Sequence, residues 1–330
     1  MKFSHTLSLL TGLLIDSVAA GSYSNPLRTS AGGDPTIVYH DGFYYFMSTN
    51  FANLQMTRAT TLEGLKNGET KQVWYETDPN RNSNIWAPEM HLVDGKWQIF
   101  YSGGPASGPQ HSLVLQGGAT PWDEYSFFTS LRPDDEWAID GTPIEINGQR
   151  YFVYSGFEPD VPDRARKQCL YITPYTSATT TGDKALLSFP EEEWETQGEI
   201  HVNEGAFGFQ RNNKTMITFS GSFCHTQFYA LGLLTYLGGD PMDRTNWEKT
   251  GPHFSSANGQ FGTGHNSFFT SPDGTETYNT YHFVTNPQGS CGNDRQAATQ
   301  LVNWNADGSP DFGTPEPLGT VSDGPSGEPL

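Results

Sequence analysis

Residues 89–102 read Glu89-Met90-His91-Leu92-Val93-Asp94-Gly95-Lys96-Trp97-Gln98-Ile99-Phe100-Tyr101-Ser102. Apolar and polar residues largely alternate on both sides of Asp94-Gly95, as they do in half-buried strands. Asp-Gly between two such segments favours a two-residue hairpin turn, because both central residues of that turn need a positive φ. The run therefore predicts a β-hairpin whose second strand is rich in aromatic residues and ends in a small one.

The same pattern occurs five times along the chain, although the fourth copy is blurred. The turns begin at residues 41, 94, 147, about 212 and 273, in steps of 53, 53, about 65 and 61 residues. Each step holds a four-stranded unit of ~40–50 residues and its loops. A two-sheet sandwich would also show alternation, but it would not repeat hairpins at this interval. We therefore predict an all-β fold, a five-bladed β-propeller, with residues 21–330 as a single domain.

The charge of the chain limits its partners. Its 330 residues contain 18 Lys and Arg against 37 Asp and Glu, which gives a formal net charge of −19. A nucleic acid or an anionic membrane surface would be repelled, so we expect neither as a partner. The 36 Gly and the 13% of aromatic residues are not typical of helical bundles or of disordered chains. We expect a turn-rich β protein that acts as a monomer.

Residues 1–20 have the arrangement of a secretory signal peptide. Lys2 is followed by an apolar stretch over residues 7–15, and the segment ends in the small residues Ser17-Val18-Ala19-Ala20. This order predicts cleavage near Ala20 and a secreted, extracellular protein. The alternative is a buried N-terminal helix.

Three cysteines are present, so a disulfide framework does not define the fold. Cys224 and Cys291 each follow a strand-like run and could lie on loops at the same rim, which predicts a bridge between them and leaves Cys169 free. The alternative is three unrelated buried thiols. The sequon at Asn213 would be glycosylated in a secreted protein.

Carboxylates recur at equivalent places in the repeat. The positions seven residues before each turn are occupied by Asp34, Ala87, Asp140, roughly Glu204, and Asn266 beside His265. In a propeller the inner strands line the central channel, so these side chains would meet at one mouth. Hydrolysis of a glycosidic bond needs a carboxylic acid and a carboxylate, and a third negative charge would keep the acid protonated. The alternative is that Asp34 and Asp140 are turn residues.

Several short motifs stand in order along the chain. They are Asp34-Pro35, Trp86-Ala87-Pro88-Glu89, Ala138-Ile139-Asp140-Gly141, Asn203-Glu204-Gly205-Ala206, Gly264-His265-Asn266-Ser267, and Arg295 leading into Val302-Asn303-Trp304. This ordered set resembles glycoside hydrolase family 43, and the resemblance covers nearly all of the chain after residue 20. The sequence departs from the commonest pattern at Ala206, where a proline often stands, and at Gly262-Thr263-Gly264 before the histidine.

The resemblance implies roles for individual residues. Asp34 would be the general base, Glu204 the general acid, and Asp140 the residue that orients the acid and raises its pKa. The family inverts configuration, which implies that the acid and base carboxyls lie ~6.5–9.5 Å apart. His265 resembles a channel histidine associated with calcium or another ion, largely through water, although a lone histidine is more often structural. Arg295 resembles an arginine that approaches the sugar. No cofactor is required for the chemistry.

Other features point to a substrate. Trp86 and Phe51 are candidates for stacking on a sugar ring, although Trp86 could equally belong to the core. The segments around Ser222-Phe223-Cys224 and Cys291 to Arg295 resemble the branch of exo-1,5-α-L-arabinofuranosidases. We therefore expect terminal α-L-arabinofuranose to be released from arabinan, a plant cell-wall polysaccharide. β-Xylosidase, arabinoxylan-debranching and endo-arabinanase activities stay open, as does a carbohydrate-binding propeller without catalysis.

Overall fold

The computed structural model describes residues 21–158 and 166–329. Within these ranges the regular structure consists of β-strands and three short 3-10 helices, Glu63–Asn67 (η1), Glu193–Glu195 (η3) and Arg244–Asn246 (η4). The all-β prediction is confirmed. The expected signal peptide, residues 1–20, lies outside the described residues. No helix in the described ranges is long and apolar enough to cross a membrane.

The strands form successive sheets along the chain. The first sheet contains β2 (Gly33–His40), β3 (Phe43–Thr49), β4 (Leu54–Ala59) and β5 (Glu69–Trp74). The second contains β6 (Ser83–Val93), β7 (Lys96–Gly104), β8 (His111–Gln116) and β9 (Ser126–Leu131). The last contains β19 (Phe261–Thr270), β20 (Thr277–Val284) and β21 (Gln296–Leu301). In all three, strands that follow one another in sequence pair antiparallel.

Between the second and last sheets lies a nine-stranded sheet. Its first group contains β10 (Ile139–Ile146), β11 (Gln149–Phe157), β12 (Lys167–Ser177), β13 (Thr180–Thr181) and β14 (Ala185–Ser188). Its second group contains β15 (His201–Arg211), β16 (Lys214–Gly221), β17 (Ala230–Tyr236) and β18 (Trp247–Phe254). A short parallel pairing of β12 with β15 joins the two groups. Two small ribbons pair β1 (Ser22–Ser24) with β24 (Val321–Asp323), and β22 (Asn303–Trp304) with β23 (Pro310–Asp311).

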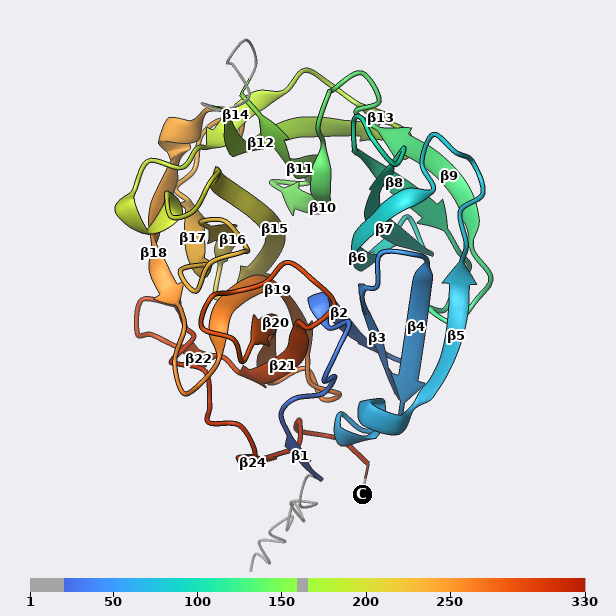
Figure 1. Cartoon of the computed structure of the whole chain (residues 1–330), viewed down its shortest axis with the longest axis vertical. Helices are drawn as coiled ribbons and strands as arrows, with labels where there is room; N and C mark the ends of the chain where they lie inside the picture. Colours follow the sequence, from blue (N-terminus) through green and yellow to red (C-terminus); the bar gives the residue numbers. More distant parts are fainter. Residues whose placement is uncertain (1–20, 159–165, 330) are drawn as a thin grey trace, which may run out of the picture.

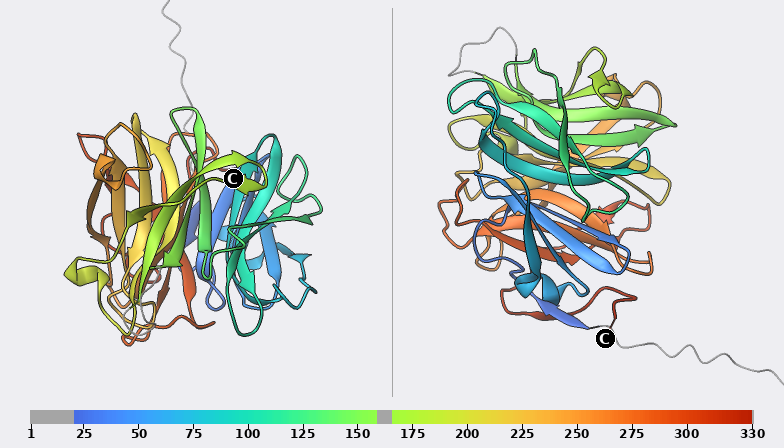
Figure 2. Two further views of the ribbon diagram at one scale, coloured as in Figure 1. Left: turned by 90° about the horizontal axis from the view of Figure 1, so that it is seen from above. Right: turned by 90° about the vertical axis from the view of Figure 1, so that its right-hand side faces the viewer.

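These groups of strands stand around a common axis (Figure 1). The first strand of each group, β2, β6, β10, β15 or β19, lies nearest the axis, and the later strands lie farther out. Figure 2 shows the strands of neighbouring groups packed side by side, and the ribbon of β1 and β24 beside the C-terminus. The last sheet thus lies next to the first, and the Ser267 hydroxyl of β19 donates to the Pro35 carbonyl of β2 at 2.8 Å.

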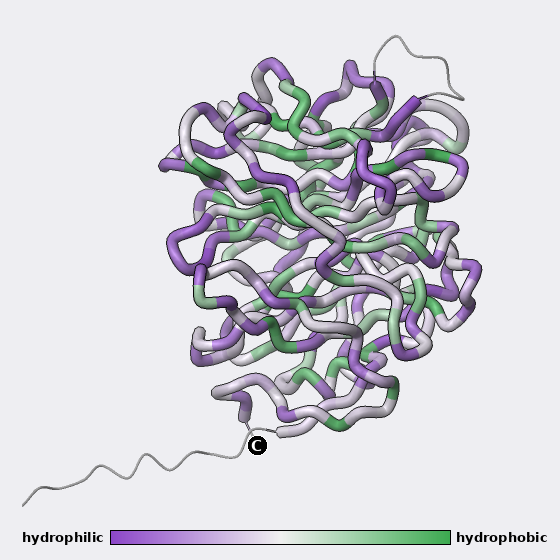
Figure 3. The backbone as a smooth tube through the Cα atoms, turned by 90° about the vertical axis from the view of Figure 1, so that its left-hand side faces the viewer, coloured by the Kyte–Doolittle hydropathy of each residue, from purple (hydrophilic) through white to green (hydrophobic). Residues whose placement is uncertain are grey.

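The apolar core is divided into five clusters that lie between neighbouring groups. Met47 of β3 and Ile99 of β7 belong to one cluster, and Phe100 of β7 and Phe152 of β11 belong to the next. Alternate residues of one strand therefore serve the two sides of a sheet, as the period of two requires. Along the backbone, hydrophilic residues are frequent in the outer loops and turns (Figure 3).

The predicted hairpin turns are confirmed in the first four groups. Asp41-Gly42, Asp94-Gly95 and Asn147-Gly148 have positive φ at both residues, between 47° and 81°. Asn212-Asn213 closes the fourth hairpin in the same way, with φ of 53° and 60°. The fifth connection differs, because residues 271–276 separate β19 from β20.

Besides Asn84 of β6 and Gly262 of β19, which also have positive φ, each axial strand carries one residue of left-handed backbone at an equivalent place near its start. These residues are Asp34, Ala87, Asp140, Gly205 and His265, with φ between 46° and 58°. A shift in register with the second strand follows or spans each of them, as in a β-bulge. The prediction that Glu204 and Asn266 are equivalent to Asp34 is wrong by one residue in each case. The fourth turn begins at Asn212, from which a count of seven gives Gly205 rather than Glu204. In the fifth group the connection is longer, so the same count gives Asn266 instead of His265.

The buried N–H of each left-handed residue donates a hydrogen bond to a side chain. In four of the five cases the accepting side chain belongs to the second strand of the preceding group. Ala87 donates to the Thr49 hydroxyl at 2.7 Å, Asp140 to Ser102 at 3.0 Å and His265 to Ser220 at 2.7 Å. Asp34 donates to His282 Nδ1 at 3.1 Å, and Gly205 donates to a carboxylate oxygen of Asp140 at 3.2 Å. We call these five bonds the clamps. The small residue at the end of the aromatic strand thus has a structural role.

A single substitution tests the clamps. Thr49→Val keeps the shape of the side chain but leaves the buried N–H of Ala87 without its acceptor, so we expect a loss of about 1–3 kcal/mol in the free energy of unfolding. Thr235→Val, in the outer part of β17, is the control, since its hydroxyl makes no hydrogen bond within the described residues. Urea denaturation measures both variants. Equal stability of the two would contradict a stabilising role for the clamp.

Candidate active site

A pocket of about 280 Å³ lies where the left-handed starts of β2, β10 and β19 meet. Every residue predicted to touch the sugar or perform the chemistry lines it. The lining residues are Asp34, Phe51, Trp86, Trp137, Ile139, Asp140, Phe157, Gln168, Ile200, Glu204, Phe223, Cys224, His265, Cys291 and Arg295. The structure therefore brings together side chains from residue 34 to residue 295.

Asp34 is buried at the floor of this pocket and its two carboxylate oxygens have different partners. Oδ2 accepts a hydrogen bond from the Thr49 hydroxyl at 2.6 Å. Oδ1 lies 2.6 Å from Nη1 of Arg295 and 3.1 Å from Nδ1 of His265. Burial alone would raise the pKa of Asp34, but the positive charges of Arg295 and His265 outweigh it and hold that pKa well below its usual range. Asp34 is therefore an ionised carboxylate.

His282 completes the surroundings of Asp34 and was not singled out from the sequence. Its Nδ1 accepts the backbone N–H of Asp34, so this nitrogen carries no proton of its own. Burial lowers the pKa of His282 to about 4, and the imidazole is therefore neutral near neutral pH. It holds the backbone of Asp34, and the same nitrogen lies 3.4 Å from Oδ1 of the carboxylate.

Asp140, Glu204 and His265 form a second group at the floor. One candidate ligand atom from each lies within 4.8 Å of those of the other two. Burial raises the pKa of Asp140 to about 7, with His265 opposing and the charges of Glu204 and Asp34 adding to the shift. The pKa of Glu204 is also raised, first by burial and then by Asp34. The two carboxyls therefore retain a proton near neutral pH, while Asp34 does not.

His265 carries a positive charge, opposite to that of an ionised carboxylate. Burial would lower its pKa, but Asp34, Asp140 and Glu204 together raise it, so the imidazolium form is favoured. Its ring also covers Gly205, where a Cβ would approach the ring at 2.8 Å. The same three groups, Asp140, Glu204 and His265, offer two carboxylates and one nitrogen to a cation such as calcium. A cation there would compete with the proton of the two carboxyls, and the expected ion stays a prediction.

Both oxygens of Glu204 have hydrogen-bond partners. Tyr229 donates its hydroxyl to Oε1 at 3.0 Å, and Gln168 donates from Nε2 to Oε2 at 2.6 Å. Tyr229 in turn stacks on His282 with ring centroids 5.5 Å apart. The sequence offered no signal for Gln168, which comes from β12 of the neighbouring group. The acid side chain is thus held in one orientation by residues from two neighbouring groups of strands.

The upper walls of the pocket are mostly apolar. Trp86 and Phe51 line it as predicted, together with Trp137 and Phe157, whose ring centroids lie 5.3 Å apart. Trp137 was not singled out from the sequence, although it directly precedes the Ala138-Ile139-Asp140-Gly141 motif, which could have drawn attention to it. Aromatic faces above a charged floor suit a sugar ring, which has both apolar faces and hydroxyls.

Two further sequence predictions concern the pairing of the cysteines and the glycosylation of Asn213. The Cys224–Cys291 disulfide is present and both residues line the pocket, whereas Cys169 is free and buried. Asn213 is exposed at the hairpin turn between β15 and β16, where a glycan would meet no obstacle from the core. Its glycosylation stays a prediction.

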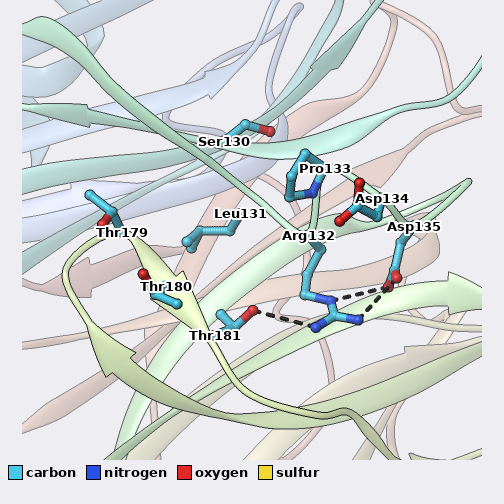
Figure 4. Close-up of a pocket in the computed structure, with 9 residues that line it drawn as sticks. All are labelled: Ser130, Leu131, Arg132, Pro133, Asp134, Asp135, Thr179, Thr180 and Thr181. Atoms are coloured by element: carbon cyan, nitrogen blue, oxygen red, sulfur yellow. Dashed lines mark hydrogen bonds and ion pairs between the residues drawn. The ribbon is translucent and has the colours of Figure 1, made fainter.

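Another pocket of about 280 Å³ lies between residues 130–135 and 179–181 (Figure 4). Its only basic lining side chain is Arg132, which pairs with Asp135 at 3.0 Å and donates to the Gly182 carbonyl at 2.9 Å. Asp135 also accepts from Lys184 at 3.0 Å. These charged side chains pair with one another across two loops. The residues of this pocket therefore hold the two loops together.

Comparison with known proteins places this geometry in a family. The sequence model of glycosyl hydrolases family 43 matches residues 23–310. An extracellular exo-α-(1→5)-L-arabinofuranosidase of Streptomyces avermitilis is 33% identical over 89% of this chain, and α-L-arabinofuranosidase B of Pyricularia oryzae is 32% identical over 90%. The chain spans 64% of the length of each of these curated relatives.

The solved structures include a similar protein of matching length. The crystal structure of an α-L-arabinofuranosidase from Lactobacillus brevis superposes with a TM-score of 0.82 and is 30% identical, covering 90% of this chain and 98% of that one. The match of the family model extends from β1 to β23 and includes all the carboxylates of the pocket. This chain belongs to glycosyl hydrolases family 43.

Proposed function

We propose that this chain is an inverting exo-1,5-α-L-arabinofuranosidase that releases terminal arabinofuranose from arabinan and arabino-oligosaccharides. The observation that carries the proposal is the opposite protonation of carboxyl groups within one pocket. Asp34 is held ionised, whereas the pair of Asp140 and Glu204 retains a proton. The substrate class rests on relatives named exo-α-(1→5)-L-arabinofuranosidase and α-L-arabinofuranosidase.

The proposed reaction uses one carboxyl on each side of the glycosidic bond. Glu204 gives its proton to the leaving oxygen as the bond from that oxygen to the anomeric carbon breaks. Asp34 takes a proton from a water molecule, whose oxygen forms the new bond to the anomeric carbon on the opposite face. When the proton shared by the pair lies on Glu204, Asp140 carries the negative charge and disfavours ionisation of Glu204, since a second anion beside the first is unfavourable.

The fold prediction is part of the same proposal. We propose that the five axial strands begin five blades of a β-propeller and that residues 21–330 form one catalytic domain. Support comes from the five interlocking groups of strands around one axis and from the core clusters between them. In a propeller of this kind the clamped strand starts converge on the mouth of the channel, where the carboxylates are needed.

We also propose that the protein is secreted. A disulfide between Cys224 and Cys291 fits an oxidising compartment, since such bridges are rare in the cytosol. Relatives from two Streptomyces species are named extracellular enzymes. Arabinan in the plant cell wall would then be reached outside the producing cell.

Product analysis tests the function. Linear 1,5-α-arabinan incubated with the purified protein is expected to yield arabinose as the only early product, which chromatography with pulsed amperometric detection resolves. A ladder of oligosaccharides would instead support endo-arabinanase action. No product from arabinan or from an aryl α-L-arabinofuranoside, together with retained binding, would support a carbohydrate-binding protein without catalysis.

Two alanine variants separate the acid from the base. Glu204→Ala should slow hydrolysis of arabinan by roughly 10²–10⁴-fold, but it should largely spare an aryl arabinoside whose leaving group needs no proton. Asp34→Ala should abolish activity on both substrates. Glu145→Ala, an exposed carboxylate on the same strand as Asp140, is the control. Equal losses on the two substrates for Glu204→Ala would contradict its role as the acid.

The pH profile tests Asp140. Glu204 acts in its protonated form, so kcat/KM should fall as pH rises through the raised pKa of the coupled pair. Asp140→Asn removes a negative charge and still offers an oxygen to the N–H of Gly205. We expect the pKa of Glu204 to fall and the alkaline limb of kcat/KM to move to lower pH. An alkaline limb that stays in place or moves upward would exclude the proposed role of Asp140.

A further inference from the structure

The Cys224–Cys291 disulfide stands in the wall of the same pocket as the three carboxylates. It joins two loops that belong to different sheets, 67 residues apart in the sequence. Residues 222–229 follow β16, and residues 285–295 lie between β20 and β21. A cross-link at this place acts on the geometry of the pocket as well as on the stability of the chain.

The loop over residues 285–295 has few other supports on this side. Residues 285–288 are exposed, and no hydrogen bond within the described residues joins the two loops. They nevertheless lie in direct contact, because a Cβ at Gly289 would stand 2.5 Å from the carbonyl carbon of Thr226. The disulfide is therefore the covalent link between two loops that touch at Gly289 and Thr226.

The position of Gly292 in this loop helps to determine the position of the Arg295 side chain. The carbonyl of Gly292, the residue after Cys291, accepts hydrogen bonds from the backbone N–H of Arg295 at 3.3 Å and from its Nε at 3.1 Å. With Nε held there, Nη1 reaches Asp34 Oδ1 at 2.6 Å. The guanidinium also covers Gly33, where a Cβ would stand 2.2 Å from Cζ, so the fit leaves no room for a shift toward β2.

The opposite side of the loop is anchored by backbone bonds. Ala31 donates to the Asn293 carbonyl at 2.7 Å, and Gly32 donates to the Arg295 carbonyl at 2.9 Å. These bonds hold the end of the loop against the segment before β2, whereas Gly292 itself makes no backbone hydrogen bond to that segment within the described residues. The disulfide and these backbone hydrogen bonds thus hold the loop from two sides.

We propose that the Cys224–Cys291 disulfide is a positioning element of the sugar pocket, which acts by fixing the Gly292 carbonyl and, through it, the guanidinium of Arg295 against Asp34. The inference rests on the proposed function for its kinetic readout. Reduction by a dithiol such as dithiothreitol adds two electrons and two protons to the S–S bond and gives two thiols, while the reductant closes to its cyclic disulfide. The pocket then loses the alignment of Arg295, and the enzyme is sensitive to reductants.

A double-mutant cycle tests the proposal. The cycle combines Cys224→Ser/Cys291→Ser with Arg295→Lys, and kcat and KM are measured on an aryl α-L-arabinofuranoside well below the melting temperature of each variant. We expect either change alone to lower kcat/KM roughly tenfold or more. If the disulfide acts through Arg295, Arg295→Lys should cost less than about threefold in the background without the disulfide. Additive losses, or an unchanged kcat/KM in the serine pair, would overturn the proposal.

Reduction of the native protein is a second test of the proposal. It does not depend on the folding of the Cys224→Ser/Cys291→Ser variant. Dithiothreitol should lower kcat/KM of the oxidised enzyme with an unchanged far-UV circular dichroism spectrum, and reoxidation should restore it. The serine pair is the control, since it retains Cys169 and should not respond to the reductant. The same cycle can be completed by comparing reduced and oxidised Arg295→Lys.

Binding separates this inference from the proposed function. Binding of L-arabinose, followed by tryptophan fluorescence, gives the same cycle without hydrolysis, because Trp86 and Trp137 line the pocket. An oxidised protein that does not hydrolyse arabinofuranosides would contradict the proposed function alone. Additive losses in affinity for arabinose would contradict the positioning role whether or not hydrolysis occurs.

Discussion

The backbone N–H of a residue in left-handed conformation at the start of each axial strand requires a partner, because it is buried and cut off from water. An unsatisfied N–H of this kind costs about 1–3 kcal/mol, and five of them would be a large fraction of the stability of an ordinary domain. The chain supplies a side-chain acceptor for each, mostly from the preceding group of strands, as with Thr49 for Ala87 and Ser102 for Asp140. Each clamp therefore fixes one group against the next, and the same bonds fix where the pocket side chains begin.

The electrostatics of the floor follow from this packing. Three carboxyls are brought together in one pocket, where they cannot all be ionised at neutral pH. Arg295 pairs with Asp34, and His265 lies 3.1 Å from it while also facing Asp140 and Glu204. The hydrogen bonds to Glu204 come from Tyr229 and Gln168, which are neutral donors. The asymmetry of the partners, rather than any difference between the carboxyls themselves, separates an ionised group from a protonated one. Preorganisation of this kind requires no movement of charged side chains when a substrate arrives.

Much of this arrangement could be predicted from the sequence, and the limits have physical reasons. The hairpins could be predicted because Asp94-Gly95 and its counterparts determine their own backbone locally. Asp34 and Asp140 could be found by counting back from those turns, but in the fourth group the same count gives Gly205, and Glu204 lies one residue before it. Gln168, Tyr229 and His282 could not be found, since their partners lie 25 to 248 residues away in the chain. Contacts of that separation depend on how the groups of strands pack, which no local pattern encodes.

Ala87 occupies the same left-handed position in the second sheet as Asp34 does in the first, yet its side chain is a single methyl group. Its conformation is maintained by the bond from its own backbone to Thr49, and a side chain with reactive atoms is not needed. Backbone geometry and chemical reactivity are therefore encoded separately at these positions. A β fold built this way can change its chemistry by exchanging one side chain at a clamped position, because the framework that aims the new side chain is already in place.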